Sequence, residues 1–357
     1  MDKRWIWIGL GLITLLIRYI TPPELIEQYY SRGIFLGIRS VFDLGFGWFP
    51  LPLFYVFYLI LIGWGIRELI RTNWRKFKSW RGIQNSLFSL TAFIGGIFFF
   101  FFFLWGYNYG RIPLVRQVSL KPQPASIEEL RKLLTEITPQ VLEARNRLSF
   151  SQSDTLAADQ LPDKMELKCR QAVVQTLSEL GYPTSGRVRG RVLFTKGILL
   201  RFGSSGVYWP FVGEGNIDGG LHTLQQPFTL CHELAHGYGI ANEGVCNFLA
   251  YVATQHSADP YIRYSGLLCY WRYVAIAFQR GAYEEYQALR NDLPKGFIAD
   301  LDAINHTLDL YPDFFPKLRY AAYDSYLKSQ GIAEGMKSYS SIIMLVEAWK
   351  KKTAQKN

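Results

Sequence analysis

Hydrophobic residues form three long apolar stretches near the start of the chain. They cover about residues 5–20, 46–66 and 87–107, and the last contains six consecutive Phe residues. A helix needs about 20 mainly apolar residues to cross a bilayer. The pattern therefore predicts a membrane domain over residues 1–110 with three transmembrane helices. No small-residue cleavage site follows the first stretch, so we expect it to be kept as a span.

After residue 110 the pattern becomes that of a water-facing domain. Residues 111–125 are polar and contain proline, which is typical of a linker. Residues 126–357 are long enough for one compact domain. Ser126 and Glu129 form a capping box that predicts a helix to about Leu148, and a second helix is expected over about residues 163–180.

Strand patterns occupy the middle of this domain, and helical patterns occupy almost everything after Leu224. Short alternating runs predict three strands and a short edge strand, at residues 187–194, 197–202, 206–212 and 215–218. The predicted fold class is α+β, mostly α, with a small sheet.

The connection between the second and third apolar stretches is strongly basic. Against Glu68 alone it carries six basic residues, namely Arg67, Arg71, Arg75, Lys76, Lys78 and Arg81. Basic loops stay in the cytoplasm, so we expect a multi-pass protein of the cell membrane whose residues from about Arg111 onward are extracytoplasmic. Much of the net charge of +10 lies in this loop beside the membrane, where basic residues interact with anionic lipid. No nucleic-acid-binding motif appears, so the expected partners are the lipid bilayer and a substrate, and nucleic acid is excluded.

Residues 232–236 read His-Glu-Leu-Ala-His within an apolar helical run. Residues four apart on a helix share a face, so the imidazoles of His232 and His236 can bind one metal ion. Glu233, one position along, can take a proton from a water on that metal. The alternative is a pair of buried histidines on a helix without a metal.

The residues that follow predict a turn and a second helix. Gly239 can end the first helix in a left-handed conformation, and Asn242 can cap the next one. That helix would present Glu243 as a third metal ligand, and Asn247, one turn later, could hold a ligating histidine by a hydrogen bond. Three protein ligands and an open position are typical of catalytic zinc, so Zn²⁺ is the expected cofactor. Alternatively, Glu243 binds no metal and is simply an acidic residue that the helix dipole favours in the first turn.

The HELAH motif, Gly239, Glu243 and the sequence NFLAY resemble a bacterial membrane-anchored family of unknown function. That family is placed among the gluzincin, or thermolysin-like, metallopeptidases. The resemblance implies a gluzincin-like zinc metallopeptidase domain whose third ligand lies in an E-x-x-x-D-like element on the second helix. Glu243 and Asn247 fit this element with Asn in place of Asp. The family has a second acid where this chain has Val245, and a site that needed that acid would be defective here.

Two further sets of residues are candidates for substrate contacts. Glu214 and Asn216 lie at the expected edge strand, to which an extended peptide could add as a further strand. A plain turn explains these residues equally well. A tetrahedral oxyanion needs a hydrogen-bond donor besides the metal, and Tyr339, which stands before a predicted helix, is the candidate.

Together these patterns predict a membrane-anchored zinc metallopeptidase, a hydrolase that cleaves a peptide or protein substrate with Glu233 as the general base. Two alternatives stay open. One is a catalytically inactive membrane-tethered binding module that keeps zinc for its structure. The other is a non-peptidase hydrolase that uses the same zinc chemistry. The chain has four cysteines, and their irregular spacing assigns no disulfide.

Overall fold

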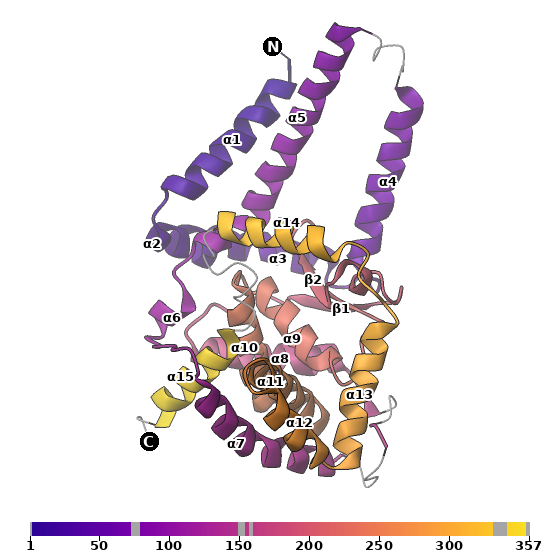
Figure 1. The fold of residues 1–357 in the computed structure, drawn as a ribbon. Helices are drawn as coiled ribbons and strands as arrows, with labels where there is room; N and C mark the ends of the chain where they lie inside the picture. The colour runs from indigo at the N-terminus through magenta and orange to yellow at the C-terminus, as the bar shows by residue number, and fades with distance from the viewer. Residues whose placement is uncertain (1, 73–78, 149–153, 157–159, 331–340, 355–357) are drawn as a thin grey trace. The chain divides into compact units, whose positions relative to one another are not determined.

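The computed structural model describes residues 2–72, 79–148, 154–156, 160–330 and 341–354. The chain is mostly helical with one small sheet, which confirms the predicted fold class (Figure 1). It divides into two compact units. The first consists of Met1–Ile112 and Trp209–Glu214, and the second of Pro113–Tyr208 and Gly215–Asn357.

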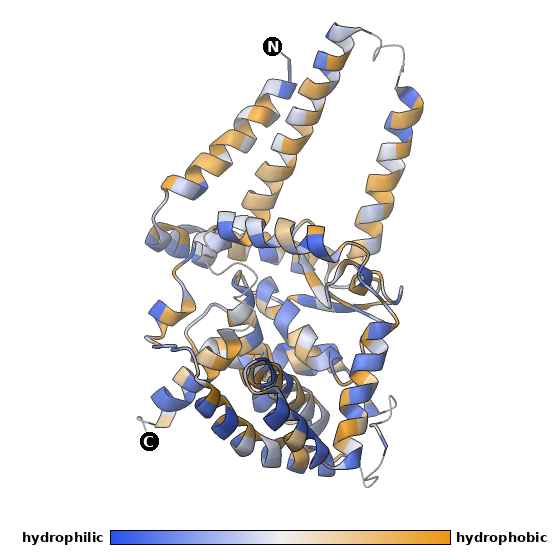
Figure 2. Ribbon diagram, viewed as in Figure 1, coloured by the Kyte–Doolittle hydropathy of each residue, from blue (hydrophilic) through white to orange (hydrophobic). Residues whose placement is uncertain are grey.

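Three apolar helices dominate the first unit: α1 (Arg4–Ile20), α4 (Leu53–Arg71) and α5 (Trp80–Leu104) (Figure 2). Within the described residues, α4 and α5 are each long and apolar enough to cross a membrane. α1 forms a third candidate span only together with the segment Pro23–Phe46, which is bent from it by 112°. Its 17 residues extend about 25 Å, which is short of a hydrocarbon core about 30 Å thick. Two of the three predicted spans are thus confirmed as candidates. The first is a candidate only if α1 and the bent segment after it count as one span.

The second predicted span was placed too early in the chain. It was expected from residue 46, but α4 begins at Leu53, after Pro50 and Pro52. Proline lacks the N–H that a helix interior requires, so the helix starts only beyond both prolines. The expected connection before α4 is itself helical. It consists of α2 (Pro23–Leu25), the π-helical η1 (Ile26–Ile34) and α3 (Phe35–Phe46).

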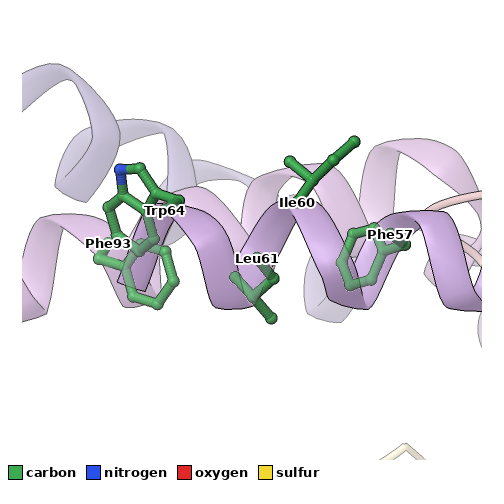
Figure 3. Close-up of a pocket in the computed structure, with 5 residues that line it drawn as sticks. All are labelled: Phe57, Ile60, Leu61, Trp64 and Phe93. Atoms are coloured by element: carbon green, nitrogen blue, oxygen red, sulfur yellow. The ribbon is translucent and has the colours of Figure 1, made fainter. Parts of the chain in front are cut away.

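A concave apolar surface lies on α4 and α5. It is lined by Phe57, Ile60, Leu61, Trp64 and Phe93 (Figure 3), and the rings of the last two stack at 5.3 Å. None of these five side chains carries a charged group. The surface therefore has no group that could perform acid–base chemistry.

The second unit contains the remaining α-helices and the sheet apart from Trp209 of β2 and Glu214 of β3. Its helices are α6 (Leu114–Gln117), α7 (Ile127–Asn146), α8 (Met165–Glu179), α9 (Gln226–Gly237), α10 (Glu243–His256), α11 (Pro260–Gly281), α12 (Tyr283–Asn291), α13 (Lys295–Asp309), α14 (Pro316–Ser329) and α15 (Ile342–Ala354). The first two helices predicted for this domain correspond to α7 and α8. Both hydrogen bonds of the predicted capping box are present, between Ser126 and Glu129.

The sheet has three strands in the order β1-β3-β2. They are β1 (Arg189–Leu193), β2 (Gly206–Trp209) and β3 (Glu214–Asp218). The prediction that residues 215–218 form an edge strand was wrong, because β3 is the central strand. The polar sequence of β3 suggested an exposed strand, yet every residue in β3 is buried.

A predicted strand at residues 197–202 is absent. Within this segment lies only a short 3₁₀ turn, η5 (Leu200–Phe202). The carboxylate of Asp218 accepts hydrogen bonds from the backbone N–H groups of Gly197, Leu199 and Leu200 at 2.6–3.1 Å. These groups are therefore unavailable to a neighbouring strand, and the segment curls around the carboxylate instead.

Helix α9 forms the centre of the second unit, and 11 of its 12 residues are buried. A helix buried on all sides is packed by other elements all round rather than exposed on a polar face. Glycine allows the closest approaches. A Cβ at Gly237 would overlap Val188, and a Cβ at Gly190 of β1 would lie 2.6 Å from a methyl of Leu230.

Two glycines of α1 provide a test of the packing in the first unit. A Cβ at Gly11 would lie 2.6 Å from the Cα of Gly95 in α5, whereas a Cβ at Gly9 would meet nothing within 4 Å. We expect Gly11→Ala to destabilise the detergent-solubilised protein by about 1–3 kcal/mol through overpacking. Gly9→Ala should be neutral or stabilising by up to about 1 kcal/mol. Thermal unfolding of both variants measures the difference, and equal midpoints would contradict this helix contact.

Candidate metal centre

A tight turn brings the start of α10 back onto the end of α9. Gly239 has φ 87° and its N–H donates to the His236 carbonyl at 2.9 Å, which ends α9. The Asn242 side chain accepts from the Val245 N–H at 3.0 Å and caps α10. Both caps confirm the sequence prediction. As a result, Glu243 in the first turn of α10 lies beside the histidines of α9.

Three predicted ligand atoms form a nearly equilateral triangle. The Nε2 atoms of His232 and His236 are 3.0 Å apart. Glu243 Oε2 lies 3.1 Å from the first nitrogen and 3.3 Å from the second. All three side chains are buried. The tertiary structure therefore brings together three groups that the sequence had assigned to one site.

The other ring nitrogens determine where each imidazole carries its hydrogen. His236 Nδ1 lies 2.7 Å from the Ile240 carbonyl, which can only accept, so Nδ1 is the donor. His232 Nδ1 lies 2.8 Å from Asn247 Oδ1. Asn247 Oδ1 is an amide oxygen and can only accept, so His232 Nδ1 is the donor in this bond as well. In the neutral rings both Nε2 atoms thus present lone pairs to each other.

Cys246 is a buried neighbour that the sequence analysis did not assign to the site. His232, His236 and Cys246 offer ligand atoms within 4.8 Å of one another, and this buried group could hold a metal ion. The Cys246 thiol lies 3.4 Å from His236 Nδ1 and donates to the Ile240 carbonyl at 3.5 Å. Burial raises the pKa of this thiol to about 11. Cys246 and Glu243 therefore contact opposite nitrogens of His236.

Glu233 lies next to the histidines but makes different contacts. The Tyr208 backbone N–H donates to its carboxylate, and burial raises the pKa of Glu233 to about 7. Its Oε2 has no hydrogen-bond partner among the described residues. A Cβ at Gly206 would lie 2.6 Å from Oε1, so β2 passes directly over the carboxylate. Glu233 is thus a buried acid poised to exchange a proton, placed beneath an edge strand.

Tyr323 of α14 is a site residue that the sequence analysis missed. Its hydroxyl donates to Glu243 Oε1 at 2.8 Å, while the other carboxylate oxygen faces the histidines. Burial alone would raise the pKa of Glu243, but the two imidazoles hold it well below its ordinary value. The contact spans 80 residues, and no local pattern distinguishes this tyrosine from the others in the chain. The candidate Tyr339 lies outside the described residues.

Glu214 and Asn216, the predicted substrate contacts, lie in β3 and are fully buried. Glu214 Oε1 accepts from the Leu53 backbone N–H at 3.0 Å. Because β3 is the central strand, an added peptide strand cannot pair with it. The basis for assigning substrate binding to these two residues is therefore lost, and β2 is the edge strand next to the site.

The four cysteines are all buried and all free. Each lies on a different helix: Cys169 on α8, Cys231 on α9, Cys246 on α10 and Cys269 on α11. They are packed as small apolar side chains.

A family model described as "Protein of unknown function (DUF3810)" matches residues 30–346. The matched range includes α9, α10 and α14, and therefore every described residue of the site. No curated protein and no solved structure matches the chain.

Proposed function

The chain belongs to this family of unknown function, DUF3810, and from its buried histidine pair we propose that it is a membrane-anchored zinc metallopeptidase. One observation carries the proposal. Two histidine nitrogens and a carboxylate oxygen converge from two helices, beside a second carboxylate that binds none of them. The resemblance of the HELAH motif to gluzincins supports the same fold and activity for the second unit.

The triangle of ligand atoms fits zinc. Ligand atoms 2.0–2.2 Å from a tetrahedral ion lie about 3.3–3.6 Å from one another. The three atoms here are 3.0–3.3 Å apart. Histidines that bind metals usually donate their other N–H to a carbonyl or carboxylate oxygen. Ile240 and Asn247 accept in this way from the two rings.

We favour Glu243 over Cys246 as the third ligand. A metal shared by both histidines must contact both Nε2 atoms. Glu243 Oε2 lies beside both of them and can contact the same metal. The thiol instead contacts His236 Nδ1, whose hydrogen is already donated to Ile240. Use of Cys246 would require the His236 ring to turn over and lose that bond.

Each remaining residue then has a role. Bound zinc would supply a Lewis acid that lowers the pKa of a water and polarises the scissile carbonyl. Glu233 takes the proton from the attacking water and passes it to the leaving amine, for which a pKa of about 7 is well matched. Tyr323 holds one oxygen of Glu243, so that the other faces the histidines. The edge strand β2 offers a backbone to which an extended peptide can pair.

Burial of the site favours a second candidate function. His232, Glu233, His236 and Glu243 are each only 4–7% exposed. A binding module that keeps zinc for its structure needs no access for a substrate. A peptidase requires part of the second unit to move, and α14, which contacts Glu243 through Tyr323, is the element that covers that residue.

We propose that the second unit is extracytoplasmic. The basic connection between α4 and α5 places that loop in the cytoplasm, so α5 leads the chain outward whether or not α1 crosses the membrane. A reporter enzyme that is active only outside the cytoplasm should therefore be active when fused after Asn357. A reporter that is active only in the cytoplasm should be silent at the same position. The reverse result would overturn this orientation.

Metal analysis of three variants tests the ligand set. We expect Glu243→Ala to lose zinc during dialysis against a competing chelator, and Cys246→Ser to retain it. Asn247→Ala, which removes only a partner of His232, should weaken zinc binding by about 10–100-fold. Elemental analysis measures retention, and cobalt-substituted wild type should show no thiolate-to-cobalt charge-transfer absorption. If only the Cys246 variant loses zinc, Cys246 and not Glu243 is the third ligand.

Glu233→Gln tests catalysis separately from metal binding. The amide has nearly the same shape but cannot accept the proton from water, so hydrolysis should fall by about 10²–10⁴-fold. Zinc content and the unfolding midpoint should stay close to those of the wild type. The measurement is mass-spectrometric detection of cleavage in a peptide library presented to both full-length proteins. Cleavage by neither protein supports the zinc-containing binding module, and equal cleavage by both removes Glu233 from the mechanism.

A further inference from the structure

Exposed apolar residues lie at the start of helix α14 and directly before it. Phe314 and Phe315, which precede the helix, and Leu318 in its first turn are 54%, 59% and 69% exposed. The face continues one turn later with two exposed alanines. The opposite face points inward, where Leu327 is fully buried and Tyr323 bonds Glu243. Clustered Phe and Leu side chains are not favoured in water, so this outer face calls for a partner.

Neighbouring residues extend this face into one patch. We define the aromatic patch as Phe202, Phe314, Phe315 and Leu318, all 54–69% exposed. The rings of Phe202 and Phe314 meet edge to face at 5.9 Å, which joins η5 to the segment just before α14. All four residues belong to the second unit.

Basic side chains accompany the aromatic patch. The guanidinium of Arg201 lies 5.5 Å from the centroid of Phe314, and Lys317 is exposed in the first turn of α14. Arg319 is neutralised by Asp313 at 2.6 Å. Aromatic and aliphatic side chains flanked by Arg and Lys are typical of surfaces that lie in the headgroup region of an anionic membrane.

We propose that the aromatic patch rests in the headgroup region of the bilayer that holds this chain's own spans. The second unit begins at Pro113, soon after α5 ends at Leu104. This short connection keeps the patch at a high effective concentration near a lipid surface. The basic residues beside the patch complement anionic headgroups, which a second copy of the same basic patch would not do.

This membrane contact has a consequence for the metal centre. α14 presents the patch on one face and Tyr323 on the other, so the lipid surface and Glu243 are contacted by the same short helix. Lipid that holds α14 would thus hold the tyrosine in its contact with Glu243. The contact with lipid does not depend on the proposed peptidase activity.

The test uses the full-length protein, reconstituted as single copies into nanodiscs of phosphatidylethanolamine and phosphatidylglycerol. Leu318→Cys is labelled with an environment-sensitive fluorophore, and Lys132→Cys of α7, whose lysine side chain is 77% exposed, is the matched control. The four native cysteines are buried, so the parent protein should stay unlabelled. Phe315→Cys repeats the measurement one turn away, in case a label disturbs its own site.

We expect labels at 318 and 315 to lose most of their fluorescence to nitroxide lipids and to be shielded from aqueous iodide. The label at 132 should show the opposite pattern. Iodide quenching without lipid quenching at 318 and 315 would overturn the proposal. Shielding from both quenchers in single-copy nanodiscs would also overturn it, and would show that the chain itself covers the patch. Shielding that appears only with two copies would identify self-association instead.

Discussion

The Nε2 atoms of His232 and His236 lie 3.0 Å apart in a buried position, and both are acceptors in the neutral rings. Two lone pairs at this distance repel unless a proton or a metal ion lies between them. Neither ring can turn to relieve the repulsion, because Ile240 and Asn247 hold the opposite nitrogens. Glu243 adds negative charge at the same point. The buried group of ligand atoms could therefore hold a proton or a metal ion between the two rings.

The surrounding fold packs closely around this arrangement. α9 is enclosed on nearly every side, and glycines allow the sheet to approach it closely. Gly206 permits β2 to pass over the carboxylate of Glu233, and Gly215 of β3 leaves room for that residue's Cβ. The left-handed turn at Gly239 makes the link between the two ligand helices short. Small residues thus set the geometry that larger side chains would prevent.

The same burial that strengthens the electrostatics also limits access. Low exposure raises the pKa of Glu233 and isolates the triangle of ligand atoms from water. Helix α14 contacts Glu243 through Tyr323, and apolar residues at its start are exposed. For the peptidase and the membrane contact that we propose, access to the site and contact with lipid would depend on the same helix.

Local physics made much of this protein predictable from its sequence. The apolar stretches, the capping box at Ser126, the caps at Gly239 and Asn242, and the shared face of the two histidines all depend on neighbours within a few residues. The start of α4 was predicted too early because the apolar stretch continues through Pro50 and Pro52, which a helix interior does not accept.

Contacts between distant segments decided the rest. Residues 197–202 looked like a strand, but the carboxylate of Asp218 takes their N–H groups. The polar run of β3 looked like an exposed edge, but it is the buried central strand. Tyr323 reaches Glu243 from 80 residues away. Sequence periodicity reports which residues share a face, whereas only the tertiary structure decides which faces meet, because that depends on packing and hydrogen bonds across the whole unit.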